Sequence, residues 1–126
     1  MIREPRDAAQ IVKDWLKVQM AADFPELTVT LELGDWKLGD APKLVVFDDS
    51  GPMGMWPVAT SPTIRVTTWT SGRERKYANR ALGLLTCKTV PGVAAILAGT
   101  SILDARDSKT RGDLASFTVR TRLRTT

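Results

Sequence analysis

The sequence contains no histidine and a single cysteine, Cys87. Without histidine, a Ser-His or Cys-His nucleophile pair, histidine acid–base catalysis and a histidine-ligated metal are all excluded. A single cysteine excludes an internal disulfide and any zinc site built from several cysteines. These absences remove most small-enzyme mechanisms. We expect a protein that is not an enzyme, and we interpret Cys87 as a small residue near a helix end.

Long apolar runs and nucleotide-binding motifs are also missing. No run reaches the roughly 18 apolar residues of a membrane span, and charged residues directly follow Ile2, where a signal peptide would be apolar. The glycines form neither a phosphate-binding loop nor a dinucleotide fingerprint. We expect a cytoplasmic chain with no membrane partner, no metal and no cofactor.

The composition is that of one globular domain spanning residues 1–126, with 43% hydrophobic and 25% charged residues. Eighteen basic and 14 acidic residues leave a net charge of +4. This mild positive bias is weak support for a nucleic-acid partner.

Hydrophobic periodicity predicts an α+β fold in the order α-β-β-β-α-β-β. We expect a mixed, mainly antiparallel sheet of about five strands with two helices packed on one face. The expected helices cover residues 5–22 and 72–87, and the expected strands cover 27–33, 44–47, 63–70, 92–97 and 115–124.

Three local patterns carry detailed predictions. The first helix should bury a stripe that contains Ala8, Ile11, Trp15, Val18 and Ala22 and is widened by Val12 and Leu16. The second should start at a capping box, S-x-x-E, formed by Ser71 and Glu74, and bury Tyr77, Ala78, Ala81, Leu82 and Leu85. The apolar run 44–47 predicts a strand covered on both faces, the second cover being either a helix of this chain or a neighbouring subunit.

The C-terminal stretch, residues 90–124, predicts two strands joined by a long charged turn. Its second strand alternates, so that Phe117 and its neighbours at odd positions face the core while Arg120, Arg122 and Arg124 face outward. The turn, residues 103–113, carries Asp104, Arg106, Asp107, Lys109 and Arg111. Such a turn should lie in water or against a partner. Its basic residues should also lower the pKa values of Asp104 and Asp107, which makes both poor general acids.

The loop 48–62 combines turn residues with the large apolar side chains Met53, Met55 and Trp56. These either fold back over the core or dock on another protein, and both alternatives stay open. Asp48 and Asp49 at its start favour turn capping over metal binding. Arg73, Lys76 and Arg80 of the second helix favour a solvated face over a phosphate-binding surface.

These features are typical of an assembly component, because closed rings of identical subunits use two different patches on each subunit. Three motifs then carry a family resemblance: DDSGPMGMWPV at 48–58, SPTIRV leading into a basic helix, and PGV…ILDARD…GDLASFTVR in the C-terminal stretch. With them, nearly the whole chain resembles the tail terminator proteins of long-tailed bacteriophages, the lambda-like family, especially those of phages that infect actinobacteria.

The resemblance implies a structural virion protein of the tail and neck. Such proteins form a hexameric ring on the last ring of tail tube protein, end tube polymerisation and present the surface that joins the head through its completion or connector protein. Viral DNA passes through the lumen without sequence-specific binding. On this interpretation the loop with Met53, Met55 and Trp56 and the charged turn become candidate subunit or tube interfaces, and Arg120, Arg122 and Arg124 become candidates for the lumen or a subunit seam. The alternatives are another head-tail connector, such as a tail-completion or head-closure protein, and a basic nucleic-acid-binding module.

Overall fold

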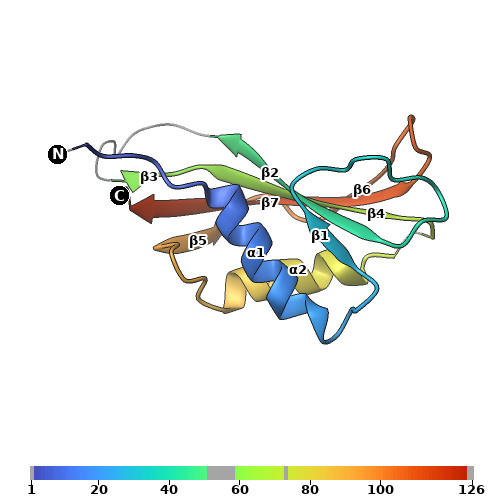
Figure 1. The fold of residues 1–126 in the computed structure, drawn as a ribbon, viewed down its shortest axis with the longest axis horizontal. Coiled ribbons are helices and arrows are strands. Elements are labelled where there is room, and N and C mark those ends of the chain that lie inside the picture. The colour runs from blue at the N-terminus through green and yellow to red at the C-terminus, as the bar shows by residue number, and fades with distance from the viewer. Residues whose placement is uncertain (1, 51–58, 73, 125–126) are drawn as a thin grey trace.

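The computed structural model describes residues 2–50, 59–72 and 74–124 (Figure 1). Its elements in chain order are α1 (Ala8–Ala21), β1 (Thr28–Thr30), β2 (Lys43–Ser50), β3 (Ala59–Thr60), β4 (Thr63–Thr70), α2 (Lys76–Cys87), β5 (Ala95–Ala98), β6 (Leu103–Arg106) and β7 (Asp113–Arg124). The predicted α+β class is confirmed, and the sheet has seven strands instead of about five.

The seven strands occupy five positions across one sheet, in the order β1, β2, β4, β7 and the outer edge formed by β5 and β6. β3 continues β4 along β7, because Ala59 pairs with Arg124 and Thr63 pairs with Arg120 in one unbroken register. Among the described strands, β1 and β2 form the only parallel pair. The prediction of a mixed, mainly antiparallel sheet is therefore correct. The two additional strands arise because two positions of the sheet are each divided, one into β3 and β4 and the other into β5 and β6.

The outer edge is interrupted between β5 and β6, where residues 99–102 lie opposite only two residues of β7. The Gly99 N–H donates to the Thr118 carbonyl at 3.1 Å, and the backbone N–H groups of Thr100 and Thr118 each donate to the other residue's hydroxyl at 3.0 Å. A Cβ at Gly99 would lie 2.6 Å from the Thr118 carbonyl oxygen. Glycine is therefore required for this close approach.

Strand ends differ from the prediction at several points. Residues 103–106 were expected in the charged turn but form β6, paired with residues 113–116, so the turn covers only 107–112. β1 ends at Thr30, three residues before the predicted strand end. The chain then leaves the sheet, and Leu33 packs with Trp36 on the sheet face away from the helices. Asp48 and Asp49 lie within β2 instead of capping a turn.

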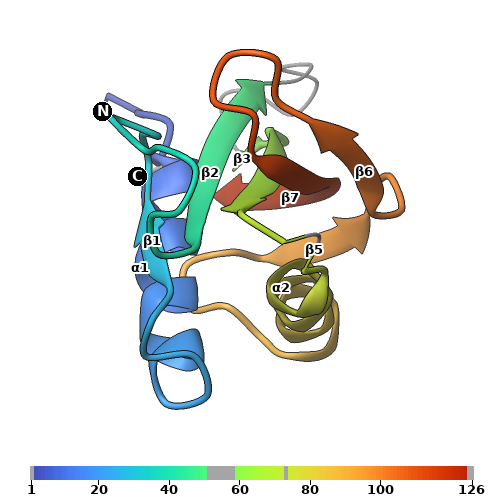
Figure 2. The ribbon, with the colours of Figure 1, turned by 90° about the vertical axis from the view of Figure 1, so that its right-hand side faces the viewer.

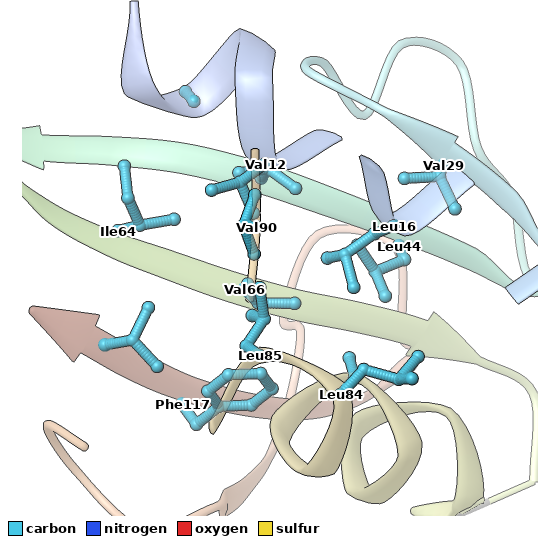
Figure 3. Close-up of a cluster of buried hydrophobic side chains, with 14 of the residues drawn as sticks. Val12, Leu16, Val29, Leu44, Ile64, Val66, Leu84, Leu85, Val90 and Phe117 are labelled. Carbon is cyan, nitrogen blue, oxygen red and sulfur yellow. The ribbon is translucent and has the colours of Figure 1, made fainter. Parts of the chain in front are cut away.

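Both helices pack on the same face of the sheet, as predicted (Figure 2). Between them and the strands lies the main core, in which Val12 and Leu16 of α1 and Leu84 and Leu85 of α2 point toward sheet residues such as Phe117 (Figure 3). These five side chains are at most 7% exposed. Their burial is the main stabilising contribution of this face.

The α1 stripe was predicted only in part. Asp7 caps the helix by accepting a hydrogen bond from the Gln10 N–H, and burial then repeats every four residues, at Ala8, Val12, Leu16 and Met20. Ile11 and Trp15 pack at its margin. Val18 and Ala22 are exposed, Val18 by 73%. The prediction is therefore correct for Ala8, Val12 and Leu16, did not include Met20, and is wrong for Val18 and Ala22, which lie on the helix surface beside the face that meets the sheet.

The predicted capping box of α2 is wrong. The Ser71 hydroxyl accepts a hydrogen bond from the Gly39 N–H at 2.8 Å, and the helix begins at Lys76 with no side-chain cap. In its buried stripe Leu84 replaces Leu82, which is only half-buried. The Tyr77 hydroxyl donates to Glu26 at 2.9 Å, and burial raises the Tyr77 pKa.

Among the described residues, those that cover the second face of the sheet gather at one end. Val45 is fully buried there with Trp36 and Trp69, and Trp36 belongs to the connection between β1 and β2. The Trp36 indole N–H donates to the Ala41 carbonyl at 2.8 Å. The second cover of the 44–47 run is thus a loop of this chain, where a helix or a neighbouring subunit had been expected.

Candidate interaction surfaces

The alternation predicted for β7 is confirmed: Ala115, Phe117, Val119, Thr121 and Leu123 are buried, whereas Arg120, Arg122 and Arg124 are exposed. The alternation places the three arginines on the face away from the helices. Leu97 of β5 lies directly opposite Arg120 and is 58% exposed. We call Leu97, Arg120, Arg122 and Arg124 the basic plate.

The arginines of the basic plate have no ion-pair partner within residues 2–50, 59–72 and 74–124. Arg65, on the same face in β4, is different. Its Nε lies 3.1 Å from an Asp49 carboxylate oxygen, and its guanidinium lies 4.2 Å from the centre of the Phe47 ring. Arg65 is held within the subunit, and the basic plate is left for another charge. Whether it faces a lumen or a subunit seam stays a prediction.

The charged turn, residues 107–112, is organised around the Asp107 carboxylate. This group accepts hydrogen bonds from the Trp69 indole at 3.2 Å, the Thr110 hydroxyl at 2.8 Å and the Lys109 N–H at 2.9 Å. Gly112 packs so closely on Trp36 that a Cβ there would lie 2.6 Å from the ring. The turn is therefore fixed to the aromatic cluster at the covered end of the sheet.

The pKa of Asp107 is lowered, as expected, but for another reason. The Lys109 N–H contributes most, followed by the Thr110 hydroxyl and the Trp69 indole. The prediction had assigned the shift to neighbouring positive charges, and that cause is wrong. Hydrogen bonds to the ionised form stabilise it directly. Asp107 thus has a structural role that the spacing of charges in the sequence did not reveal.

The other candidates in this region separate into two groups. Asp104 pairs with Arg75 at 3.0 Å, and Arg106 approaches Asp113 at 3.7 Å. Lys109 and Arg111 are exposed and form no ion pair with any residue the structure describes. Of the five interface residues predicted in the charged turn, only Lys109 and Arg111 are therefore left available for an external carboxylate.

A pocket of about 430 Å³ lies between the start of α2 and β6. Its charged lining consists of Glu74, Arg75, Asp104, Arg106 and Asp113. The Arg75 guanidinium also donates to the Ile102 carbonyl at 2.8 Å, so ion pairs and backbone contacts already engage it. Sequence reasoning missed the pocket because its two halves are distant in the chain and were assigned to a capping box and a turn.

The remaining candidates are the apolar residues of the 48–62 loop and the basic residues at the start of the second helix. Met53, Met55 and Trp56, and also Arg73, lie outside the described residues. The Lys76 ammonium lies 3.8 Å from the Glu74 carboxylate, and the Arg80 guanidinium lies 2.6 Å from the Asp23 carboxylate. All four side chains are exposed, which is consistent with a solvated helix face.

Neither a metal centre nor a membrane span is found in the described ranges. No group of three or more His, Cys, Asp or Glu side chains among these residues is arranged to hold a metal. No described helix combines the length and apolar character needed to cross a bilayer. No protein-family model and no curated protein matches the sequence.

Proposed function

We propose that this chain is a structural virion protein, a tail terminator that forms a ring on the end of a phage tail tube. The observation that carries the proposal is the asymmetry of the sheet. One face is closed by α1 and α2, while the other presents the basic plate with three arginines that find no partner in the described chain. An exposed charged and apolar surface on a rigid sheet is suited to assembly.

The resemblance in the 48–58 loop, the SPTIRV strand and the C-terminal stretch supplies the biological setting. In that setting the ring stops the growth of the tube, and its opposite side receives the head-completion or connector protein. Copies of this chain, the tube protein and the connector are the partners, and DNA passes through the lumen. The protein acts by shape in the virion neck, after assembly in the bacterial cytoplasm, and it transforms no substrate.

A second candidate, nucleic-acid binding, is favoured by the arginines of the basic plate alone. Single-stranded nucleic acids bind where exposed aromatic rings accompany basic residues. On this face Trp36 and Trp69 are each only 7% exposed, and Phe47 is half-buried with the Arg65 guanidinium 4.2 Å from its ring centre. The aromatic part of such a site is therefore poorly accessible, and the assembly proposal is the better supported of the two.

Mass measurement and microscopy test the proposal. Size-exclusion chromatography with light scattering should give a six-fold mass, and electron micrographs of the purified protein should contain rings. A monomer that binds DNA with a steep salt dependence would favour the second candidate instead. Some tail terminators assemble only on the tube. If the protein is a monomer and does not bind DNA, the tail-length measurement described at the end of the Discussion therefore tests the proposal.

A further inference from the structure

We propose that the loop between β1 and β2 of one copy docks on the basic plate of the next copy. This inference rests on the proposed function, because it specifies the contact between subunits. The docking loop contributes Glu32, Asp35, Leu38 and Asp40, which we call the acidic loop. All four residues are exposed, Leu38 by 53%. The acidic loop and the basic plate thus each combine several charges of one sign with one exposed leucine.

The unpaired carboxylates are concentrated in this loop. Glu32 and Asp35 have no ion-pair or hydrogen-bond partner for their carboxylates within the described part of the chain. Elsewhere, carboxylates such as Asp23, Asp49 and Asp104 pair with arginines of the same subunit. Three carboxylates and Lys37 leave residues 32–40 with a net charge of −2 (−3 + 1). The loop therefore complements the three arginines of the plate.

The acidic loop is held in one shape before any partner arrives. The Lys37 N–H donates to the Asp40 carboxylate at 2.8 Å, and the Gly39 N–H donates to the Ser71 hydroxyl at 2.8 Å. Trp36 is buried beneath it. The arginines of the plate lie on a continuous strand, where alternate residues are spaced by about 6.6 Å. Two preorganised surfaces lose little conformational entropy on association.

The two surfaces lie at opposite ends of the long axis (Figure 1). The connection that bears the acidic loop is at the right-hand end, and the C-terminal half of β7 is at the left-hand end. One subunit therefore cannot join its own loop to its own plate. A contact between unlike patches of successive copies is heterologous, and it gives a ring when the rotation between copies closes.

A second copy fits the plate better than a nucleic acid does. Leu97 is exposed in direct opposition to Arg120, and Leu103 of β6 is exposed by 61% on the same face. A phosphate backbone offers nothing apolar to cover these leucines. Leu38 is an exposed apolar side chain that can cover these leucines, and it belongs to the same loop as the carboxylates.

Reciprocal charge reversal tests the contact. Variant A carries Arg120→Glu and Arg122→Glu, and variant B carries Glu32→Lys and Asp35→Lys. We expect wild-type protein to self-associate more strongly at low than at high salt, and A and B to associate at least about tenfold more weakly than wild type when each is alone. An equimolar mixture should regain association, because the acidic loop of A meets the unchanged plate of B and the reversed loop of B meets the reversed plate of A. Sedimentation velocity measures all four samples.

The matched control for variant A carries Lys17→Glu and Lys88→Glu, which make the same change of net charge as variant A at exposed residues of the helical side. It should associate like wild type, and thermal melts should show that every variant is folded. A mixture of A and B that stays monomeric overturns the contact, as does wild type that stays monomeric at every soluble concentration. The contact is also overturned if the wild type does not self-associate and a duplex DNA probe binds the wild type and variant B but not variant A. None of these results decides the proposed function, which the tail-length measurement tests separately.

Discussion

The two faces of the sheet are made by the same strands but have different roles. Toward the helices, Phe117 and Val119 of β7 are buried in the main core. Toward the other side, Arg120 and Arg122 of the same strand stay in solvent without a partner in the described ranges. Burial on the first face stabilises the subunit, whereas the second face leaves charge and apolar area available for assembly. Substitutions on the two faces should therefore separate stability from association.

The largest effect is expected on the helix-covered face. Phe117→Ala should lower the free energy of unfolding by about 3–5 kcal/mol, because it removes a ring that is 1% exposed and leaves a cavity. Urea denaturation monitored by circular dichroism measures the change. A loss within about 0.5 kcal/mol would contradict the facing of β7 and with it the division between the two faces.

A smaller effect is expected at the outer edge. Gly99→Ala should cost about 1–3 kcal/mol, because the new Cβ meets the backbone of Thr118 and the interruption between β5 and β6 must shift. Gly83→Ala is the control, since a Cβ on that exposed helical glycine meets no atom within 4 Å. Equal stability of the two variants would show that the close approach at Gly99 is not needed.

The covered end of the second face should show a pH-dependent effect. Asp107→Asn should lower the free energy of unfolding by about 1 kcal/mol near neutral pH, because a neutral amide replaces the ionised carboxylate that accepts these hydrogen bonds. The folded pKa of Asp107 is below its ordinary value of 3.8, so its carboxylate stabilises the fold above that value. As the pH falls through the folded pKa, the difference between wild type and variant should disappear.

Thermal melts from pH 7 to pH 2 measure this convergence. Asp104→Asn is the control, because its ion pair with Arg75 is exposed and should contribute little at any pH. A constant difference between wild type and Asp107→Asn across the range would contradict the role of the charged form.

The smallest effect on stability is expected at the basic plate. Replacing both Arg120 and Arg122 by alanine should change the free energy of unfolding by no more than about 0.5 kcal/mol, since no described residue pairs with them. The same variant should fail to support phage production. Normal phage yield would remove these arginines from any essential surface.

Sequence reasoning succeeded where a single period governs a long element. The bounds of β4 were predicted to the residue, and the inward and outward positions of β7 were correct, because alternation over eight or more residues leaves one possible facing. The amphipathic helices were found as well, although the centre of the α1 stripe was displaced toward Val18. Apolar residues outnumber the positions that the sheet can cover, and the sequence does not say which are left out.

The errors have a common physical origin in contacts between distant segments. The capping box failed because the Ser71 hydroxyl bonds to Gly39, a residue 32 positions away. β6 was missed because Leu103–Arg106 has no buried residue and is a strand only through its pairing with β7. The cover of Val45 by Trp36 and the anchoring of Asp107 by Trp69 likewise depend on tertiary packing. Local patterns cannot reveal such contacts.

The measurement that most directly tests the account is the length of tails made without this protein. Electron micrographs of lysates from a phage that lacks the gene for this chain should show tails of variable, often excessive length that are not joined to filled heads. Wild-type protein supplied in trans should restore uniform tails and joined particles. Tails of normal, uniform length attached to heads in the absence of the protein would contradict the proposal that it caps the tube.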